Sequence, residues 1–184
     1  QRRQAKVVNF GLLYGMGPFR LARDTGMTLG EAEEFIEAYF ARVPGIKRYL
    51  EDTKKQAERD GFVKTLLGRR RYFPVLGQGS DGVHGSTERS RAEREATNSP
   101  IQGTAADIIK LAMLELGRQL PSSFPDAYML MQVHDELVFE CSDQDATPLA
   151  DLARGIMEGA FSLRIPLRVD VAVGQNWDEM KVLV

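Results

Sequence analysis

The sequence predicts an α+β fold, with a helical first part followed by helices packed on a small antiparallel sheet. Three observations support this class. Apolar residues recur at helical spacing in residues 35–40, Gly and Pro separate successive segments, and two short apolar runs flank a turn near residue 135. The 184 residues are 43% apolar, which is sufficient for one domain or two small subdomains.

The first part is predicted to form four helices. Residues 1–14 and 17–25 form the first two, because glycines separate them. Thr28 is expected to cap the third helix, because Glu31 follows three residues later, as in a capping box. Residues 44–60 form the fourth, which starts at a proline and is followed by a glycine.

The middle of the chain is predicted to contain a strand, a loop and two helices. The strand covers residues 62–67, and the glycine-rich segment 76–86 is expected to be a surface loop. Residues 87–96 form a charged helix and residues 103–119 a longer one. Pro100 is expected to break the chain between them, since proline removes a helical hydrogen bond.

The last part is predicted to supply the sheet. Two apolar strands, residues 128–133 and 137–141, flank a tight turn. A helix over residues 145–161 and a strand over residues 167–173 follow. Residues 174–184 are expected to form an irregular tail.

The charges separate along the chain, although the net charge is only −2. Residues 1–94 hold 18 Lys and Arg against 12 Asp and Glu, whereas residues 95–184 hold 6 against 14. This distribution suits a protein that binds phosphates with one part and metal ions with the other. Chance segregation on solvated faces is the alternative.

The residue counts exclude several classes. A single cysteine, Cys141, rules out a disulfide within the chain. With only two histidines a zinc site is not expected, whereas carboxylates remain available for a harder metal. No apolar run reaches the roughly 18 residues of a membrane helix, and no signal peptide is visible.

Four residues of the first helix recur at intervals of four and share one face: Arg2, Lys6, Phe10 and Tyr14. The two cations stand near the positive end of the helix dipole, where cations are unfavourable. A polyphosphate would remove this conflict, and an aromatic ring one turn further on would press on a sugar or base. An amphipathic helix whose basic face is only exposed to solvent is the alternative interpretation.

Two further groups of polar residues carry possible chemistry. The turn between the apolar strands holds His134, Asp135 and Glu136, and a carboxylate there is placed to bind Mg²⁺. The alternative is that Asp135 is an ordinary turn residue without a ligand. The second group recurs every four residues and consists of Arg94, Asn98 and Gln102. These side chains are of the types that contact bases, sugars and phosphates. A polar helix face without a ligand is the alternative.

Taken in order, these segments resemble the family A DNA polymerases, the bacterial DNA polymerase I-like family. RRQAKVVNFGLLYG is similar to the fingers-helix motif of that family, and NSPIQGTAADIIKLAM and QVHDELVFE resemble two palm motifs. LGRRRYFP fits the turn between them. The resemblance covers essentially the whole chain and implies helical fingers over residues 1–62 and the C-terminal part of a palm over residues 63–184.

The resemblance implies roles for the first helix. Arg2 and Lys6 would bind the triphosphate of an incoming dNTP, and Lys6 would also act as a general acid toward pyrophosphate. Phe10 would lie against the sugar, and Phe rather than Tyr there implies poor acceptance of dideoxynucleotides. Tyr14 and Gly15 would contact the template base and the nascent pair.

The resemblance also implies a DNA contact set and a metal site. Asp135 would ligate Mg²⁺, with two ions in the complete enzyme, and Glu136 would support it. The implied activity is template-directed DNA synthesis from dNTPs. The residues that would contact the primer–template DNA are Arg94, Asn98, Gln102 and His134.

One motif of the family, an Asp-Tyr-Ser-Gln-Ile-Glu-Leu-Arg strand that supplies a second catalytic carboxylate, is not found in these residues. Nothing around Asp107 or Asp170 supports either as a substitute. The chain is therefore expected to be the C-terminal piece of a larger cytoplasmic, bacterial or phage-like polymerase. Its partners would include the upstream palm, the thumb and possible exonuclease domains, and it would be inactive alone. A single-subunit RNA polymerase and a non-catalytic nucleic-acid-binding module remain alternatives.

Overall fold

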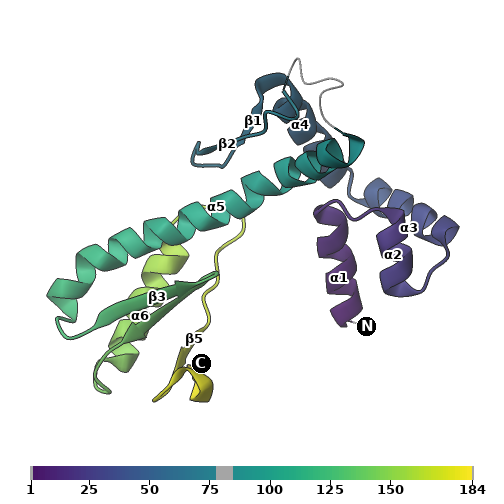
Figure 1. Ribbon diagram of the computed structural model, residues 1–184. Coiled ribbons are helices and arrows are strands. Elements are labelled where there is room, and N and C mark those ends of the chain that lie inside the picture. The colour runs from purple at the N-terminus through teal and green to yellow at the C-terminus, as the bar shows by residue number, and fades with distance from the viewer. Residues whose placement is uncertain (1, 78–84, 184) are drawn as a thin grey trace. The chain divides into compact units, whose positions relative to one another are not determined.

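The computed structural model describes residues 2–77 and 85–183, with side chains from residue 5 onward (Figure 1). These residues form helices and three two-stranded antiparallel sheets, which confirms the α+β prediction. Most of the glycine-rich loop predicted at 76–86 lies outside the described residues. The chain divides into two compact units, Gln1–Thr104 and Ala105–Val184. The predicted assignment of residues 1–62 to fingers and 63–184 to palm stays a prediction.

The first unit begins with four helices, as predicted. Two of them end at glycines in the left-handed conformation, Gly26 with φ 79° and Gly61 with φ 71°. Glycine adopts this conformation without strain, so both helices stop sharply. The bounds of the helices are α1 Arg2–Leu13, α2 Pro18–Thr25, α3 Leu29–Arg42 and α4 Pro44–Asp60.

The predicted capping box at the start of α3 is confirmed. The Thr28 hydroxyl accepts a hydrogen bond from the Glu31 backbone N–H at 3.3 Å, and the Glu31 carboxylate accepts one from the Thr28 N–H at 2.8 Å. Both bonds satisfy donors that the helix itself leaves free. The bonds from Thr28 also hold the pKa of Glu31 below its usual 4.5.

Replacing Thr28 by Ala is expected to lower the free energy of unfolding by about 1 kcal/mol, because the cap loses its acceptor. Urea denaturation measures this difference, with Thr28→Ser as the control that keeps the hydroxyl. Since the pKa of Glu31 is lowered by folding, its contribution is complete above pH 4.5 and is lost as the pH falls below that value. Equal stability of the Ala and Ser variants at pH 7 would contradict the expectation.

A short hairpin follows α4. It consists of β1, Phe62–Lys64, and β2, Arg70–Tyr72, paired antiparallel. The segment assigned to β2 was predicted as a turn, so the second strand is a correction. The hairpin contributes Val63 to a core that also contains Ala57, Phe73, Leu76, Ala92 and Ala96.

The chain then forms one long helix, α5, Ser86–Ser123. The prediction that Pro100 breaks this region into two helices is wrong. The hydroxyl of Ser99 donates to the backbone oxygen of Glu95 at 2.6 Å, and the hydroxyl of Tyr49 donates to that of Thr97 at 3.2 Å.

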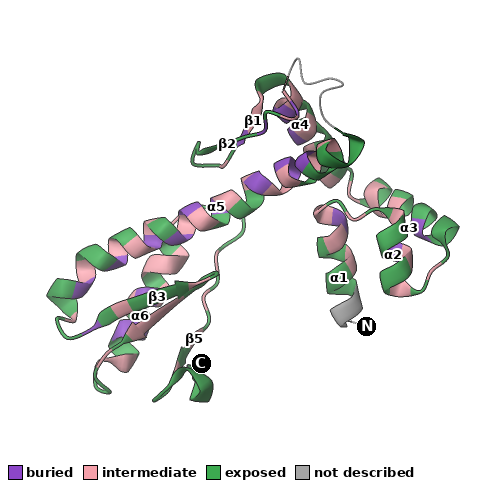
Figure 2. Cartoon of the chain, viewed as in Figure 1, coloured by how far each residue is buried: buried purple, intermediate pink, exposed green. Residues whose placement is uncertain are grey.

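The helix tolerates its proline for a reason of packing. Proline removes the hydrogen bond that the Ala96 oxygen would accept, and the two hydroxyls bond the neighbouring oxygens of Glu95 and Thr97. The same stretch of α5 also packs Ala92 and Ala96 into the core of the first unit, and this burial outweighs the local preference against proline. Figure 2 shows buried residues recurring along α5.

The second unit contains the predicted hairpin and helix on a core of its own. The predicted strand over residues 167–173 is shorter than expected, and the tail after it returns as a second strand. The elements are β3 Tyr128–Val133, β4 Glu136–Glu140, α6 Ala146–Gly159, β5 Val171–Val173, the 3₁₀ turn η1 Trp177–Glu179, and β6 Lys181–Leu183. The buried core residues are Leu116, Leu120, Ala127, Leu149 and Ala153.

Within the described part of the chain, no helix is both long and apolar enough to span a membrane.

Candidate nucleotide and nucleic-acid site

Two side chains of α1 and that of Tyr14, directly after it, form the stripe that the four-residue spacing predicts. The Phe10 and Tyr14 rings stack with their centroids 6.2 Å apart and their planes 29° apart. The Lys6 ammonium nitrogen lies 5.8 Å from the Phe10 centroid, within cation–π range. Lys6 and Phe10 are exposed and Tyr14 is half-buried. Arg2 belongs to the same helix, and its side chain is outside the described set.

The stripe ends at a glycine that contacts α5. Gly15 has φ 80°, and its N–H donates to the Leu12 oxygen at 3.1 Å. A Cβ at this position would lie 3.2 Å from Cγ of Arg94. The aliphatic part of Arg94 therefore packs against the glycine that follows Tyr14. The structure thus brings together two of the motifs that the sequence separates by about 80 residues.

The predicted polar face of α5 lies on one uninterrupted helix. Arg94, Asn98 and Gln102 are spaced by four residues and so drift slowly across one side. Gln102 is exposed, whereas the Asn98 side-chain oxygen is buried and has no hydrogen-bond partner among the described residues.

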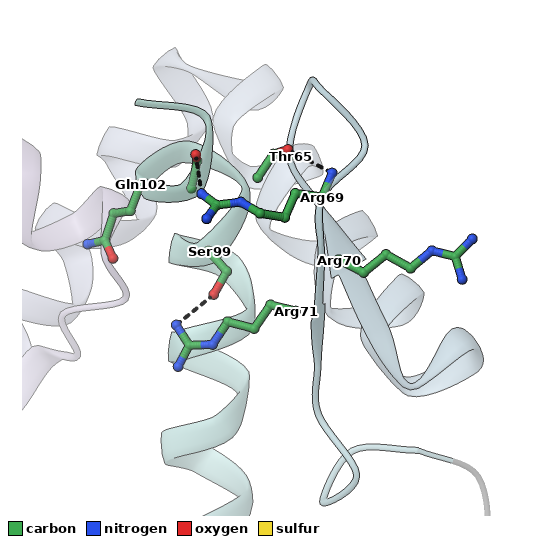
Figure 3. A pocket seen from close by; sticks show the side chains of 7 residues that line it. Thr65, Arg69, Arg70, Arg71, Ser99 and Gln102 are labelled. Atoms are coloured by element: carbon green, nitrogen blue, oxygen red, sulfur yellow. Dashed lines mark hydrogen bonds between the residues drawn. The ribbon is translucent and has the colours of Figure 1, made fainter. Parts of the chain in front are cut away.

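A basic groove lies between the β1–β2 hairpin and α5 in the first unit. Its volume is about 320 Å³, and three consecutive arginines line one side. Figure 3 shows two of them reaching toward α5, while Arg70 points to the other side of its strand. The lining residues are Thr65, Arg69, Arg70, Arg71, Ser99, Gln102 and Gly103.

Two of the arginines hold the hairpin on α5. Arg69 donates to the backbone oxygen of Gly103 at 3.0 Å. Arg71 donates to the Ser99 hydroxyl at 3.1 Å and to the Glu95 carboxylate at 2.7 Å. Hydrogen bonds that involve a charged partner are stronger than neutral ones, so these contacts fix the hairpin beside the polar face of the helix.

The hairpin turn approaches α5 closely at a glycine. A Cβ at Gly103 would lie only 2.6 Å from Cγ2 of Thr65. Next to it, the Leu66 N–H donates to the Thr104 hydroxyl at 3.0 Å. The absence of a side chain at Gly103 therefore allows the hairpin to reach its position on α5.

The second unit carries the predicted His-Asp-Glu tip between β3 and β4. His134 has φ 54°, a left-handed conformation that non-glycine residues rarely adopt. The Gln132 amide donates to the His134 backbone oxygen at 3.0 Å and stabilises the turn. His134, Asp135 and Glu136 are all exposed, so the tip presents its carboxylates to solvent.

The carboxylates of the tip supply part of what a metal site requires. Asp135 supplies oxygen ligands of the kind that Mg²⁺ prefers. Among the described residues, however, no group of three or more His, Cys, Asp or Glu side chains is arranged to hold a metal ion. Asp107 is buried on α5 and Asp170 is exposed before β5. The donor chemistry at Asp135 fits Mg²⁺, and further ligands would have to come from outside these residues.

The arginines of the hairpin are candidate site residues to which the sequence patterns assign no role. The segment LGRRRYFP was treated as a turn, without a role for its side chains. The available signal was the run of three arginines beside an aromatic residue, a pattern typical of nucleic-acid-binding surfaces. A stripe of a cation and aromatic rings, a polar helix face and a basic groove are the features expected of a site for nucleotides or nucleic acids, and they form the candidate site.

Comparison with known proteins is consistent with this class. Residues 1–179 match the model of the family described as "DNA polymerase family A". It is 46% identical over 179 residues to DNA polymerase I of Pseudomonas aeruginosa, covering 97% of this chain and 19% of the relative. It is 48% identical over 181 residues to DNA polymerase I of Deinococcus radiodurans, covering 98% of this chain and 18% of the relative.

The fold has a solved counterpart. It is similar to the POL domain of Pol1 from M. smegmatis, solved in complex with DNA primer-template and dNTP, with a TM-score of 0.87 and 42% identity. The similarity covers 96% of this chain and 30% of that one. The chain therefore belongs to DNA polymerase family A. It spans about a fifth of the length of the curated relatives that it matches.

Proposed function

We propose that this chain takes part in template-directed DNA synthesis, as part of a larger family A DNA polymerase. The observation that carries the proposal is the stripe on α1, which ends where Gly15 meets Arg94. Membership of the family supports it, and so does the solved relative, whose title states a complex with DNA primer-template and dNTP.

The stripe has the length and the order of groups that one nucleotide requires. From Lys6 to Tyr14 it extends about 12 Å, at 1.5 Å per helical residue. In the proposal, Arg2 and Lys6 bind the triphosphate, Phe10 lies against the sugar, and Tyr14 contacts the template base. A cation followed by two stacked rings matches a ligand that is anionic at one end and planar at the other.

Lys6 has two parts in the proposed chemistry. Its positive charge faces the negative charge that builds on the phosphates as the primer 3′-hydroxyl attacks. Its ammonium can also donate a proton to the departing pyrophosphate, as a general acid. The exposed position of Lys6 on α1 leaves its side chain accessible for both.

The remaining residues are proposed to hold the DNA and the metal. Asp135 would hold Mg²⁺, with Glu136 in support. When bound, the two ions of a complete enzyme activate the attacking oxygen and neutralise charge on the leaving group. A cytoplasmic location stays a prediction. The proposed primer–template contacts are Arg94, Asn98, Gln102 and His134, of which Arg94, Gln102 and His134 are exposed.

Two alternatives differ in what they bind. A single-subunit RNA polymerase would prefer rNTPs, and the match to a DNA polymerase family argues against it. A non-catalytic module would bind primer–template in a salt-dependent manner but would show no Mg²⁺-dependent binding of nucleotides. Comparing dNTP with rNTP binding, with and without Mg²⁺, separates the three.

The decisive experiment compares this 184-residue chain with a chimera, in which the chain replaces the matching segment of DNA polymerase I from Pseudomonas aeruginosa. We expect the chain alone to bind primer–template without extending it, because a two-metal site needs carboxylates from separate places and no such cluster is present in residues 2–77 and 85–183, the part that the structure describes. The chimera is expected to extend a labelled primer with dNTPs and Mg²⁺. Robust extension by the chain alone would contradict the first expectation, and a folded but inactive chimera would contradict the proposed function.

A further inference from the structure

The outward face of the β1–β2 hairpin is distinct from the groove on its other side. Alternate residues of a strand point to opposite faces, and the register pairs Phe62 with Tyr72 and Lys64 with Arg70. These four side chains therefore share one face. Val63 and its partner in the register point the other way, toward the core and α5.

The four side chains form a compact aromatic and cationic surface. The Phe62 and Tyr72 ring centroids are 5.6 Å apart. The Arg70 guanidinium carbon lies 4.8 Å and the Lys64 nitrogen 5.4 Å from the Phe62 centroid. Tyr72 is 63% exposed, which is unusual for so large a ring, so one ring face remains available to a planar ligand.

The charges of this surface are only partly balanced by the protein, since Lys64 interacts with Asp60, whose pKa is lowered by hydrogen bonding to Arg59 and to a smaller extent by Lys64. Lys64 lies directly opposite Arg70, and like charges in this position destabilise a strand pair. Among the described residues, no carboxylate lies within salt-bridge distance of either cation. Asp60 is near Lys64, but it is bonded to Arg59 at 2.7 and 3.0 Å. A phosphate between the two cations would remove their repulsion.

We propose that this surface, formed by Phe62, Lys64, Arg70 and Tyr72, binds the unpaired template strand of a primer–template, with one base stacked on Tyr72 and a phosphate between Lys64 and Arg70. Exposed aromatic rings flanked by cations are the features with which proteins bind single strands, because only an unpaired base has a free face for stacking. The proposal rests on the proposed function, since a primer–template always carries an unpaired template segment.

Fluorescence anisotropy of the purified protein tests this inference. The probes are two fluorescein-labelled primer–templates that share the same duplex. Their unpaired template overhangs are about one and about eight nucleotides long, and the longer one lies within the site sizes of proteins that bind single strands. The wild-type protein is expected to bind the longer overhang more tightly. Tyr72→Ala is expected to reduce this affinity by about fivefold to tenfold and to leave the affinity for the short overhang unchanged.

The salt dependence tests the two cations separately. Replacing Lys64 and Arg70 by Ala is expected to lower the slope of log affinity against log salt by about 0.7, since the two cations share one phosphate and each phosphate contact of a single strand contributes about 0.7. Two control variants show whether the effects are specific. Tyr72→Phe keeps the ring and should bind as the wild type does. Arg118→Ala removes one exposed cation elsewhere and should leave the preference for the longer overhang intact.

Three results would overturn the inference. The first is an unchanged overhang preference in Tyr72→Ala and in the Lys64 and Arg70 double variant, with thermal unfolding showing that both are folded. The second is weaker binding of both probes to an equal extent. The third is a loss of affinity in the variants that appears only with a probe whose unpaired segment belongs to the non-template strand, which would assign the surface to that strand. A wild-type protein that binds neither probe would instead count against the proposed function.

Discussion

Replacing Asp135 by Asn is expected to lower the rate of primer extension by the chimera about a thousandfold or more, equivalent to about 4 kcal/mol of transition-state stabilisation. The amide has nearly the same size and fits the exposed turn, so the fold should not change. It lacks the negative charge and one of the two oxygen ligands that the carboxylate offers to Mg²⁺. The loss should therefore appear in the chemical step and not in primer–template affinity.

Single-turnover extension in Mg²⁺ measures this effect, and anisotropy with labelled DNA measures the affinity. Glu140→Gln provides the matched control, because it makes the same carboxylate-to-amide change at the far end of the same hairpin. This variant should extend primers at nearly the wild-type rate. A rate for Asp135→Asn within tenfold of the wild type would exclude Asp135 as the metal-binding carboxylate.

The second large effect is expected at the contact between the hairpin and α5. Gly103→Ala should lower the free energy of unfolding by about 2 kcal/mol, although alanine normally favours a helix over glycine by about 1 kcal/mol. The new Cβ would lie 2.6 Å from Cγ2 of Thr65, so the hairpin must move. That movement weakens the hydrogen bonds from Arg69 to the Gly103 oxygen and from Leu66 to Thr104, each contributing about 1 kcal/mol.

A second substitution tests whether this single contact is the cause. Thr65→Ser removes Cγ2 but keeps the hydroxyl, which accepts a hydrogen bond from the Arg69 N–H at 3.1 Å. The double variant of Thr65→Ser and Gly103→Ala should recover most of the lost stability in urea unfolding. If Gly103→Ala alone is as stable as the wild type, the proposed close packing between hairpin and helix is wrong.

The helices of the first unit could be predicted from sequence because their signals are local. The capping box needs only Thr28 and Glu31, and the end of α4 needs only the glycine that follows Asp60. The spacing of Lys6, Phe10 and Tyr14 likewise fixes their common face once a helix forms. The hairpin tip at Asp135 was predictable for the same reason, since its strands are adjacent in the chain.

The errors lie where distant residues decide the local structure. Pro100 argues locally for a break, but the burial of Ala92 and Ala96 in the core keeps α5 continuous. Strand β2 consists of the three residues Arg70–Tyr72, and only pairing with β1 makes it a strand. Short strands have weak intrinsic preferences, so their existence depends on their neighbours.

The sequence by itself determined the four helices of the first unit, the turn at the His-Asp-Glu tip and the motifs of a family A polymerase, because each depends on residues a few positions apart. The tertiary structure decided which arginines bind α5 and which one faces outward, and it placed Arg94 against Gly15. The physical reason is that such contacts depend on how segments far apart in the chain pack together, and no local pattern of residues encodes that packing.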